Sequence, residues 1–155
     1  MSDSIAENIA RWAATTKSAD LPDSVRDAAR RSFVDVVGLC LAARDTDYVK
    51  AAMNAWEGAG AGGECSVIGH GAKMDAVGTA FVNGTASHGE DYDDTFEGTP
   101  VHTGAAAGVG AALGLDENKI KDGLGVAGSF ASGIIEYLTE GAWTKRLHPG
   151  WAAQS

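Results

Sequence analysis

The chain has 155 residues, a formal net charge of −9 at pH 7 and a sequence pI of about 4.7. This acidic balance argues against a nucleic-acid-binding protein, which needs a basic face to displace counterions from phosphate, and against adhesion to an anionic membrane. No apolar run reaches the roughly 18 residues of a transmembrane helix, and the charges of Asp3, Glu7 and Arg11 are unlike a signal peptide. We therefore expect a cytoplasmic protein with no nucleic-acid and no membrane partner.

Small residues dominate the apolar part of the sequence. Alanine and the 21 glycines together make up almost a third of the chain. Such side chains bury little area each, so a core built from them depends on close helix approach. We expect a helical domain that gains stability from a second subunit, most simply as a homodimer.

Cysteine usage and glycine spacing limit the possible cofactors. Cys40 and Cys65 cannot supply the three or four thiolates that usually hold an iron–sulfur cluster, nor a cysteine-rich zinc site. We expect two reduced thiols, as is usual in the cytosol. The glycine-rich stretches at 58–63 and 123–133 match neither GxGxxG nor the P-loop pattern, so no nucleotide site is assigned.

The first part of the chain predicts helices. Ser4 and Glu7 have capping-box spacing and begin a helix that ends near Thr16. Pro22, tolerated in a first turn, begins a second helix that fades by Ala43. Apolar residues recur at helical intervals in both, at Ile5, Ile9, Trp12 and Ala13 in the first and at Val25, Ala29, Phe33, Val36 and Cys40 in the second.

The following segments alternate short elements with loops. A third helix is expected over 47–56, and the only β-type run is 65–68. Asp75 is a candidate N-cap for a small-residue helix through about Ser87. An interior glycine costs a helix about 1 kcal/mol relative to alanine. We therefore expect the glycines of this helix to lie where another backbone packs closely against it.

Residues 88–104 lack helical periodicity and predict a loop. Helices are expected over 105–113, ending at Gly114, and over 116–129, before a mixed tail at 134–155. The predicted fold is mainly α, a small-residue-rich helical domain over 1–155 with at most a short β segment near 65–68.

The most informative loop is acidic. Glu90, Asp91, Asp93 and Asp94 place four carboxylates within five positions, and no Lys or Arg occurs between Lys73 and Lys119. Crowded carboxylates either stay in water or enter a site where some pKa values rise and a distant cation compensates. A solvated acidic loop is the simpler interpretation. Flanking histidines favour the other one, because carboxylate plus imidazole suits acid–base catalysis near neutral pH.

A metal site in the same loop is a further alternative. His88, Asp91 and Asp93 could ligate a cation. Their spacing misses the calcium-loop pattern, and a zinc or iron site would need ligands from elsewhere. We predict no metal.

The tail carries a cationic cluster. Lys145, Arg146 and His148 place up to three positive groups within four residues, beside Trp143 and Trp151. Such a cluster is a plausible binding site for a small carboxylate, which arginine can bind bidentately. A basic helix end, or a salt bridge to the acidic loop, is the alternative, and both roles are compatible.

Together these segments resemble the 2-methylcitrate dehydratase (MmgE/PrpD) family, which includes cis-aconitate decarboxylase and iminodisuccinate epimerase. The resemblance covers nearly the whole chain and rests on the following pieces: residues 22–41, Asn83-Gly84-Thr85-Ala86, His88, Asp91-Tyr92-Asp93-Asp94-Thr95, His102, residues 111–116, residues 125–129 and residues 144–153.

The chain departs from the family pattern in two places. Family members insert several helices between a His-Pro-Gly-like and a Gly-x-His-x-Thr-Gly-like element, whereas here His102 leads almost directly into Ala105. We expect an internal deletion near 102–105, which leaves open which family histidine His102 represents. The family's α/β lid domain, which carries a further active-site histidine, is expected to be absent after Ser155.

The resemblance implies a lyase of the dehydratase type that acts on a small di- or tricarboxylate without metal or organic cofactor. It implies that Asp91 and His102 lie at the proton-transfer centre, with Thr95 orienting by hydrogen bond. Lys145 would meet a substrate carboxylate, supported by Arg146 and His148, with His88 nearby. Decarboxylase or epimerase chemistry, or a non-catalytic helical remnant that associates as a subunit, stays open.

Overall fold

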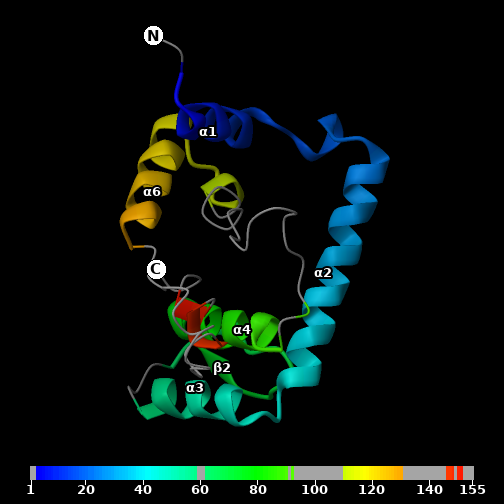
Figure 1. Ribbon diagram of the computed structural model, residues 1–155, viewed down its shortest axis with the longest axis vertical. Coiled ribbons are helices and arrows are strands. Elements are labelled where there is room, and N and C mark those ends of the chain that lie inside the picture. Colours follow the sequence, from blue (N-terminus) through cyan, green and yellow to red (C-terminus); the bar gives the residue numbers. More distant parts are fainter. Residues whose placement is uncertain are drawn as a thin grey trace, which may run out of the picture. The chain divides into compact units, whose positions relative to one another are not determined.

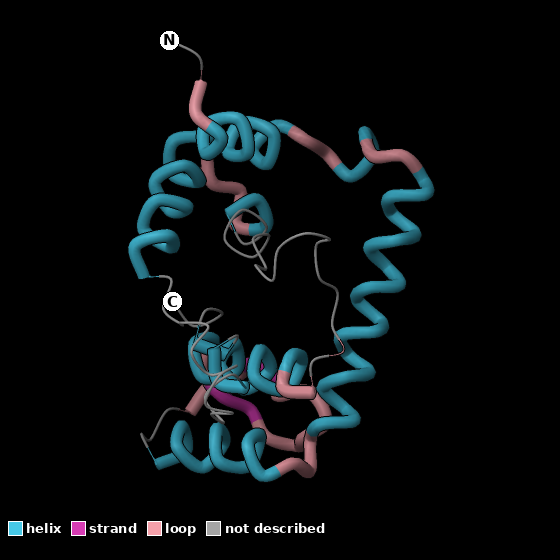
Figure 2. The backbone as a smooth tube through the Cα atoms, in the orientation of Figure 1, coloured by secondary structure: helices cyan, strands magenta, loops and turns pink. Residues whose placement is uncertain are grey.

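The computed structural model describes residues 3–58, 62–90, 92, 110–130, 146–148 and 150–151. It is mainly helical, as predicted (Figures 1 and 2). The elements are α1 (Ile5–Thr15), the short 3-10 helix η1 (Ser18–Asp20), α2 (Asp23–Ala43), α3 (Asp47–Gly58), β1 (Cys65–Ser66), β2 (Lys73–Met74), α4 (Ala76–His88) and α6 (Glu117–Phe130). None of the helices among these residues is both long and apolar enough to cross a membrane.

The contacts divide the chain into two compact units. One comprises Met1–Arg30 with Thr95–Ala131, and the other comprises Arg31–Asp94 with Ser132–Ser155. Each unit is described by itself below. The expectation of one domain with a deletion near 102–105 stays a prediction.

The first unit is built on α1 and α6, which lie side by side (Figure 1). Ala10 and Ala13 are buried against Ile120, and Leu115 and Leu124 pack around them. The alanines let the two helices approach closely, which is how a small-residue core is expected to pack.

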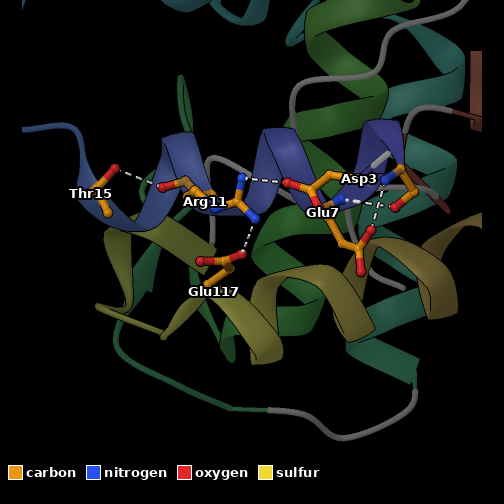
Figure 3. Close-up of polar contacts among 6 residues, drawn as sticks. Asp3, Glu7, Arg11, Thr15 and Glu117 are labelled. Atoms are coloured by element: carbon orange, nitrogen blue, oxygen red, sulfur yellow. Dashed lines mark hydrogen bonds and ion pairs between the residues drawn. The ribbon is translucent and has the colours of Figure 1, made fainter. Parts of the chain in front are cut away.

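Polar contacts fix the start of α1 (Figure 3). Ser4 Oγ accepts from the Glu7 backbone N–H at 3.2 Å, and Glu7 Oε2 accepts from the Ser4 N–H at 2.7 Å. Arg11 reaches Asp3 at 2.8 Å and Glu117 of α6 at 3.2 Å. These two carboxylates raise the pKa of Arg11, chiefly through its hydrogen bond to Asp3. The predicted capping box is therefore present, and Arg11 bridges α1 to α6.

The second unit contains a two-stranded antiparallel hairpin. Cys65 pairs with Met74 and Ser66 with Lys73. The sequence predicts the first strand, and the second was missed because two residues carry no readable alternation. The connecting turn is closed by the Val67 N–H, which donates to the Ala72 carbonyl at 3.3 Å.

The core of the second unit lies where α3, α4 and the hairpin meet (Figure 1). Trp56 of α3 stacks on Phe81 of α4 with ring centroids 5.9 Å apart. A Cβ at Gly78 would lie 2.1 Å from Trp56 Nε1, so the helix glycine admits an indole ring rather than another backbone. The buried members of this core are Cys40, Ala43, Tyr48, Val49, Ala52, Val67, Met74, Val82 and Ala86.

Asn83 ties α4 to the hairpin. Its Oδ1 accepts from the Ile68 N–H at 3.0 Å, and its Nδ2 donates to the Ser66 carbonyl at 3.3 Å. The side chain thus bonds one backbone acceptor in β1 and one backbone donor just after it.

Several large apolar residues of α1 and α2 are exposed, although their helical spacing would suggest a buried face. Ile5 is 80% exposed and Trp12 61%, while the alanines of α1 face α6. Phe33 and Val34 of α2 are each 70% exposed, and Cys40 at the end of that helix is buried. The small residues of α1 therefore make the contacts inside its unit, and the large ones face outward.

Candidate functional site

The α4 helix carries the chain into the acidic loop. Asp75 caps its first turn by accepting from the Gly78 N–H at 2.6 Å, as the sequence predicts. The helix ends at His88, with Gly89 as its C-cap and Glu90 as the next residue. Glu90 is the first carboxylate of the acidic cluster, so the start of this loop is fixed by a well-capped helix.

Tyr48 of α3 lies against this helix end. Its hydroxyl donates to Glu90 Oε1 at 2.7 Å. A Cβ at Gly89 would lie 2.2 Å from Cε2 of the Tyr48 ring. The ring therefore packs directly on the Gly89 backbone, and Tyr48 is only 2% exposed.

This environment keeps the Tyr48 hydroxyl protonated into the alkaline range. Burial raises the pKa of Tyr48 to about 12, and the hydrogen bond to Glu90 adds to the shift. The positive charge of Arg146 acts in the opposite direction. The hydroxyl therefore remains a hydrogen-bond donor at neutral pH.

The cationic segment meets the same side chain. The Arg146 guanidinium carbon lies 5.3 Å from the centroid of the Tyr48 ring, within the range of a cation–π contact. Arg146 Nε is buried, and it has no hydrogen-bond partner within the described structure. A carboxylate bound beside Arg146 could accept from this N–H, which is the geometry that arginine uses for bidentate binding.

The end of this segment rests on α4. A Cβ at Gly150 would lie 2.1 Å from Thr85 Oγ1 and 2.5 Å from the Phe81 carbonyl oxygen. Thr85 is fully buried, and its hydroxyl lacks a hydrogen-bond partner in the part of the chain that the structure describes. One helix therefore both delivers the acidic loop and supports the cationic segment.

The predicted site residues are only partly described. Arg146, His148 and His88 are half-buried and lie in the second unit. Asp91, Thr95, His102 and Lys145 lie outside the described residues. Asp91 directly follows Glu90 in the chain, and Lys145 directly precedes Arg146.

Sequence reasoning missed Tyr48 and Thr85 as parts of this region. Tyr48 is 42 positions from Glu90, so no local pattern links them. Thr85 lies in the family-like piece at 83–86, which was the one available signal. The structure shows that it supports the backbone of Gly150.

Metal binding is not decided by the described residues. They contain no group of three His, Cys, Asp or Glu side chains placed to hold a metal ion. Asp91 and Asp93, which the metal interpretation requires, are outside this part of the chain.

Comparison with known sequences identifies the family. No curated protein matches the chain at a significant level. The sequence model of the MmgE/PrpD N-terminal domain matches residues 7–105 and residues 97–155, two segments that overlap at 97–105. Together they cover the chain from position 7 to its last residue, so the protein belongs to the MmgE/PrpD family.

Proposed function

We propose that the protein is a cofactor-independent lyase of the dehydratase type that acts on a small di- or tricarboxylate such as 2-methylcitrate. The observation that carries this proposal is the meeting of Glu90 and Arg146 on Tyr48, within the second unit. Membership of the MmgE/PrpD family supports the same class of reaction.

The reaction would use the acid–base and cationic residues that the sequence predicts for the site. A base removes the proton on the carbon next to a substrate carboxylate, the carbon–oxygen bond of the β-hydroxyl breaks, and a proton from an acid lets the hydroxyl leave as water. We assign the proton transfers to Asp91 and His102, with Thr95 orienting one of them by hydrogen bond. Which group is the acid and which is the base is left open.

Cations would stabilise the negative charge that develops on the substrate. We assign this role to Lys145, supported by Arg146 and His148, because arginine and lysine beside a developing enolate lower its energy in a water-poor site. The buried Arg146 Nε, a donor without an acceptor in the described residues, supports a carboxylate-binding role. His88 at the end of α4 would flank the same substrate.

The proposed internal deletion has its own support. The two matched segments of the family domain meet at 97–105, where the sequence predicts the missing helices. A decarboxylase or an epimerase acting on a related polycarboxylate would use the same proton-transfer groups.

A second candidate is a non-catalytic subunit that associates through apolar helix faces. Phe33 and Val34, each 70% exposed, together with Ile5 and Trp12, favour it. Phe33 and Val34 are adjacent on α2, and exposed apolar side chains that lie together often mark an interaction surface. We therefore propose a homodimer for either candidate. We also propose a cytoplasmic location, consistent with the two free thiols Cys40 and Cys65.

Binding and turnover of 2-methylcitrate, citrate and cis-aconitate by the purified protein test the first candidate. We expect Lys145→Ala and Asp91→Asn to lower kcat/KM by about 10² or more, the usual contribution of a positioned acid or base. Lys50→Ala and Asp122→Asn, on exposed helix positions, are matched charge controls. A chelator should leave the activity intact.

A folded protein that neither binds nor turns over any of these compounds would leave the subunit candidate alone. Activity that survives both site substitutions would disprove the residue assignment, and loss of activity with a chelator would restore the metal interpretation. Light scattering should report a dimer that Phe33→Gln weakens, whereas a monomeric wild-type protein would contradict the assembly.

A further inference from the structure

Tyr48 touches both charged segments from a third element of the fold. It belongs to α3, whereas Glu90 follows α4 and Arg146 lies in the tail. We propose that Tyr48 is the positioning residue of the site, whose ring seats the Arg146 guanidinium and whose hydroxyl holds Glu90. This inference rests on the proposed function for its catalytic consequence, and on the contacts alone for its structural part.

The hydroxyl fixes the beginning of the acidic loop. Tyr48 Oη donates to Glu90 Oε1 at 2.7 Å, a short bond between a buried phenol and an exposed carboxylate. The ring also packs on the Gly89 backbone, so two consecutive loop residues contact one rigid side chain. The main chain is therefore held at Gly89 and Glu90, directly after α4 ends.

The ring fixes the cationic segment independently of the hydroxyl. The Arg146 guanidinium lies over its face at 5.3 Å from the centroid. A guanidinium held by a π-face keeps its N–H groups available for a carboxylate, which a salt bridge through the same N–H groups would not. Seating Arg146 on Tyr48 thus prepares it to bind an anion.

An ordinary core tyrosine would not require these two partners. Tyr48 is part of the apolar core with Val49 and Ala52, and its ring alone would satisfy that role. A phenylalanine would keep the packing on Gly89 and the face presented to Arg146, but it would lose the bond to Glu90. The two functions are therefore separable by substitution.

Limited trypsin digestion of the full chain tests the seating of Arg146 without any ligand. The measured quantity is the initial rate of cleavage after Arg146, divided by the rate after Arg44, an exposed site in the same unit. Tyr48→Leu should raise this ratio about tenfold, the size expected for loss of a largely desolvated cation–π contact. Tyr48→Phe should leave it within about twofold of the wild-type value, because the ring face remains.

Val49→Ala is the control for general loosening, because Val49 is a fully buried neighbour on α3. It should lower stability without raising the cleavage ratio. An unchanged ratio in Tyr48→Leu, or an equal rise in Val49→Ala, would overturn the seating of Arg146.

A double-mutant cycle tests the hydroxyl. Unfolding free energies of Tyr48→Phe, Glu90→Ala and the double variant should be non-additive, because the first substitution already removes the bond that the second one breaks. Additive effects would overturn the proposed hold on Glu90.

The catalytic consequence is a split between the kinetic constants. Tyr48→Leu should raise KM and lower kcat, since it removes both the ring that contacts Arg146 and the hydroxyl that bonds Glu90. Tyr48→Phe should lower kcat with little change in KM, since only the bond to Glu90 is lost. Equal effects of both variants on both constants would contradict the positioning role. The two proposals can fail separately. If the wild-type protein shows no turnover but the digestion and double-mutant results are as expected, the proposed lyase is wrong. Tyr48 would still be the residue that contacts both segments.

Discussion

Gly150 approaches Thr85 so closely that a Cβ on residue 150 would lie 2.1 Å from the threonine Oγ1. The same Cβ would lie 2.5 Å from the Phe81 carbonyl oxygen, a backbone atom inside α4 that cannot move without disturbing the helix. Only glycine fits at position 150, and the approach fixes the cationic segment on a particular turn of α4.

Gly150→Ala should therefore displace the segment that carries Arg146. We expect a loss of about 1 to 3 kcal/mol in the free energy of unfolding, typical of overpacking at a tight contact. Tryptic cleavage after Arg146 should also become faster. Gly71→Ala is the matched control, since a Cβ there has no neighbour within 4 Å. Equal stability of both variants would show that Gly150 does not pack on α4 in solution.

Replacing each of two helix glycines with alanine should change the stability of the protein in opposite directions. Gly78 in the first turn of α4 faces the Trp56 indole, and its Cβ would lie 2.1 Å from Nε1, so Gly78→Ala should cost about 1 to 3 kcal/mol. Gly38 within α2 has nothing within 4 Å of its Cβ, so Gly38→Ala should stabilise by roughly 0.5 to 1 kcal/mol. Urea denaturation of both variants checks the pair, and a stabilised Gly78→Ala would refute the close approach of Trp56.

Local chemistry was enough to predict most of the helices. The capping box of Ser4 and Glu7, the N-cap Asp75 and the start of α2 after Pro22 are all found where the sequence predicts them. Each of these signals acts within one helical turn, so neighbouring residues determine it. The same holds for α6, whose start is marked by Asp116 accepting from the Lys119 N–H at 3.0 Å.

Contacts between distant residues could not be predicted in this way. Nothing in the sequence around Tyr48 distinguishes a tyrosine that binds Glu90 and Arg146 from one that merely fills a core. The helical repeat of Ile5 and Trp12 was also insufficient, because periodicity identifies an apolar face without showing what covers it. In α1 the close packing of Ala10 on α6 decides which face is buried.

We expect Asn83 to stabilise the fold, although it lies in the segment at 83–86 that resembles the family. Its amide bonds Ile68 and Ser66 at 3.0 and 3.3 Å, and Asn83→Ala would leave both backbone groups without these partners. We expect a loss of about 1 to 2 kcal/mol, the net contribution of two hydrogen bonds of which one is part-buried and one exposed. Asn54→Ala, at an exposed position on α3, is the control. An Asn83→Ala protein as stable as the control would contradict this role.

The stability that the capping box of α1 contributes should depend on pH in the acidic range. The pKa of Glu7 is lowered, chiefly by the hydrogen bond from the Ser4 backbone N–H. A lowered pKa in the folded state means that the contribution is present above the model value of 4.5 and is lost as the pH falls through the folded value. Glu7→Ala should lower stability near neutral pH, because it removes the carboxylate that accepts from the Ser4 N–H. This cost should shrink on acidification, and a pH-independent cost would argue against the reciprocal bonds.

The stability that Tyr48 contributes should instead be lost as the pH rises in the alkaline range. Its pKa is raised from 10.0 to about 12, so the folded protein favours the protonated phenol. The contribution is fully present below pH 10 and is lost as the pH rises through about 12, because ionisation would place a second negative charge beside Glu90 in a buried site. The charge of Arg146 offsets only part of this repulsion. Urea denaturation of wild type and Tyr48→Phe across this range measures the effect as the difference in unfolding free energy between the two proteins, which cancels contributions that both share. The wild-type advantage should shrink steadily between these two pH values. A constant difference would mean that the Tyr48 hydroxyl is solvated and does not hold Glu90.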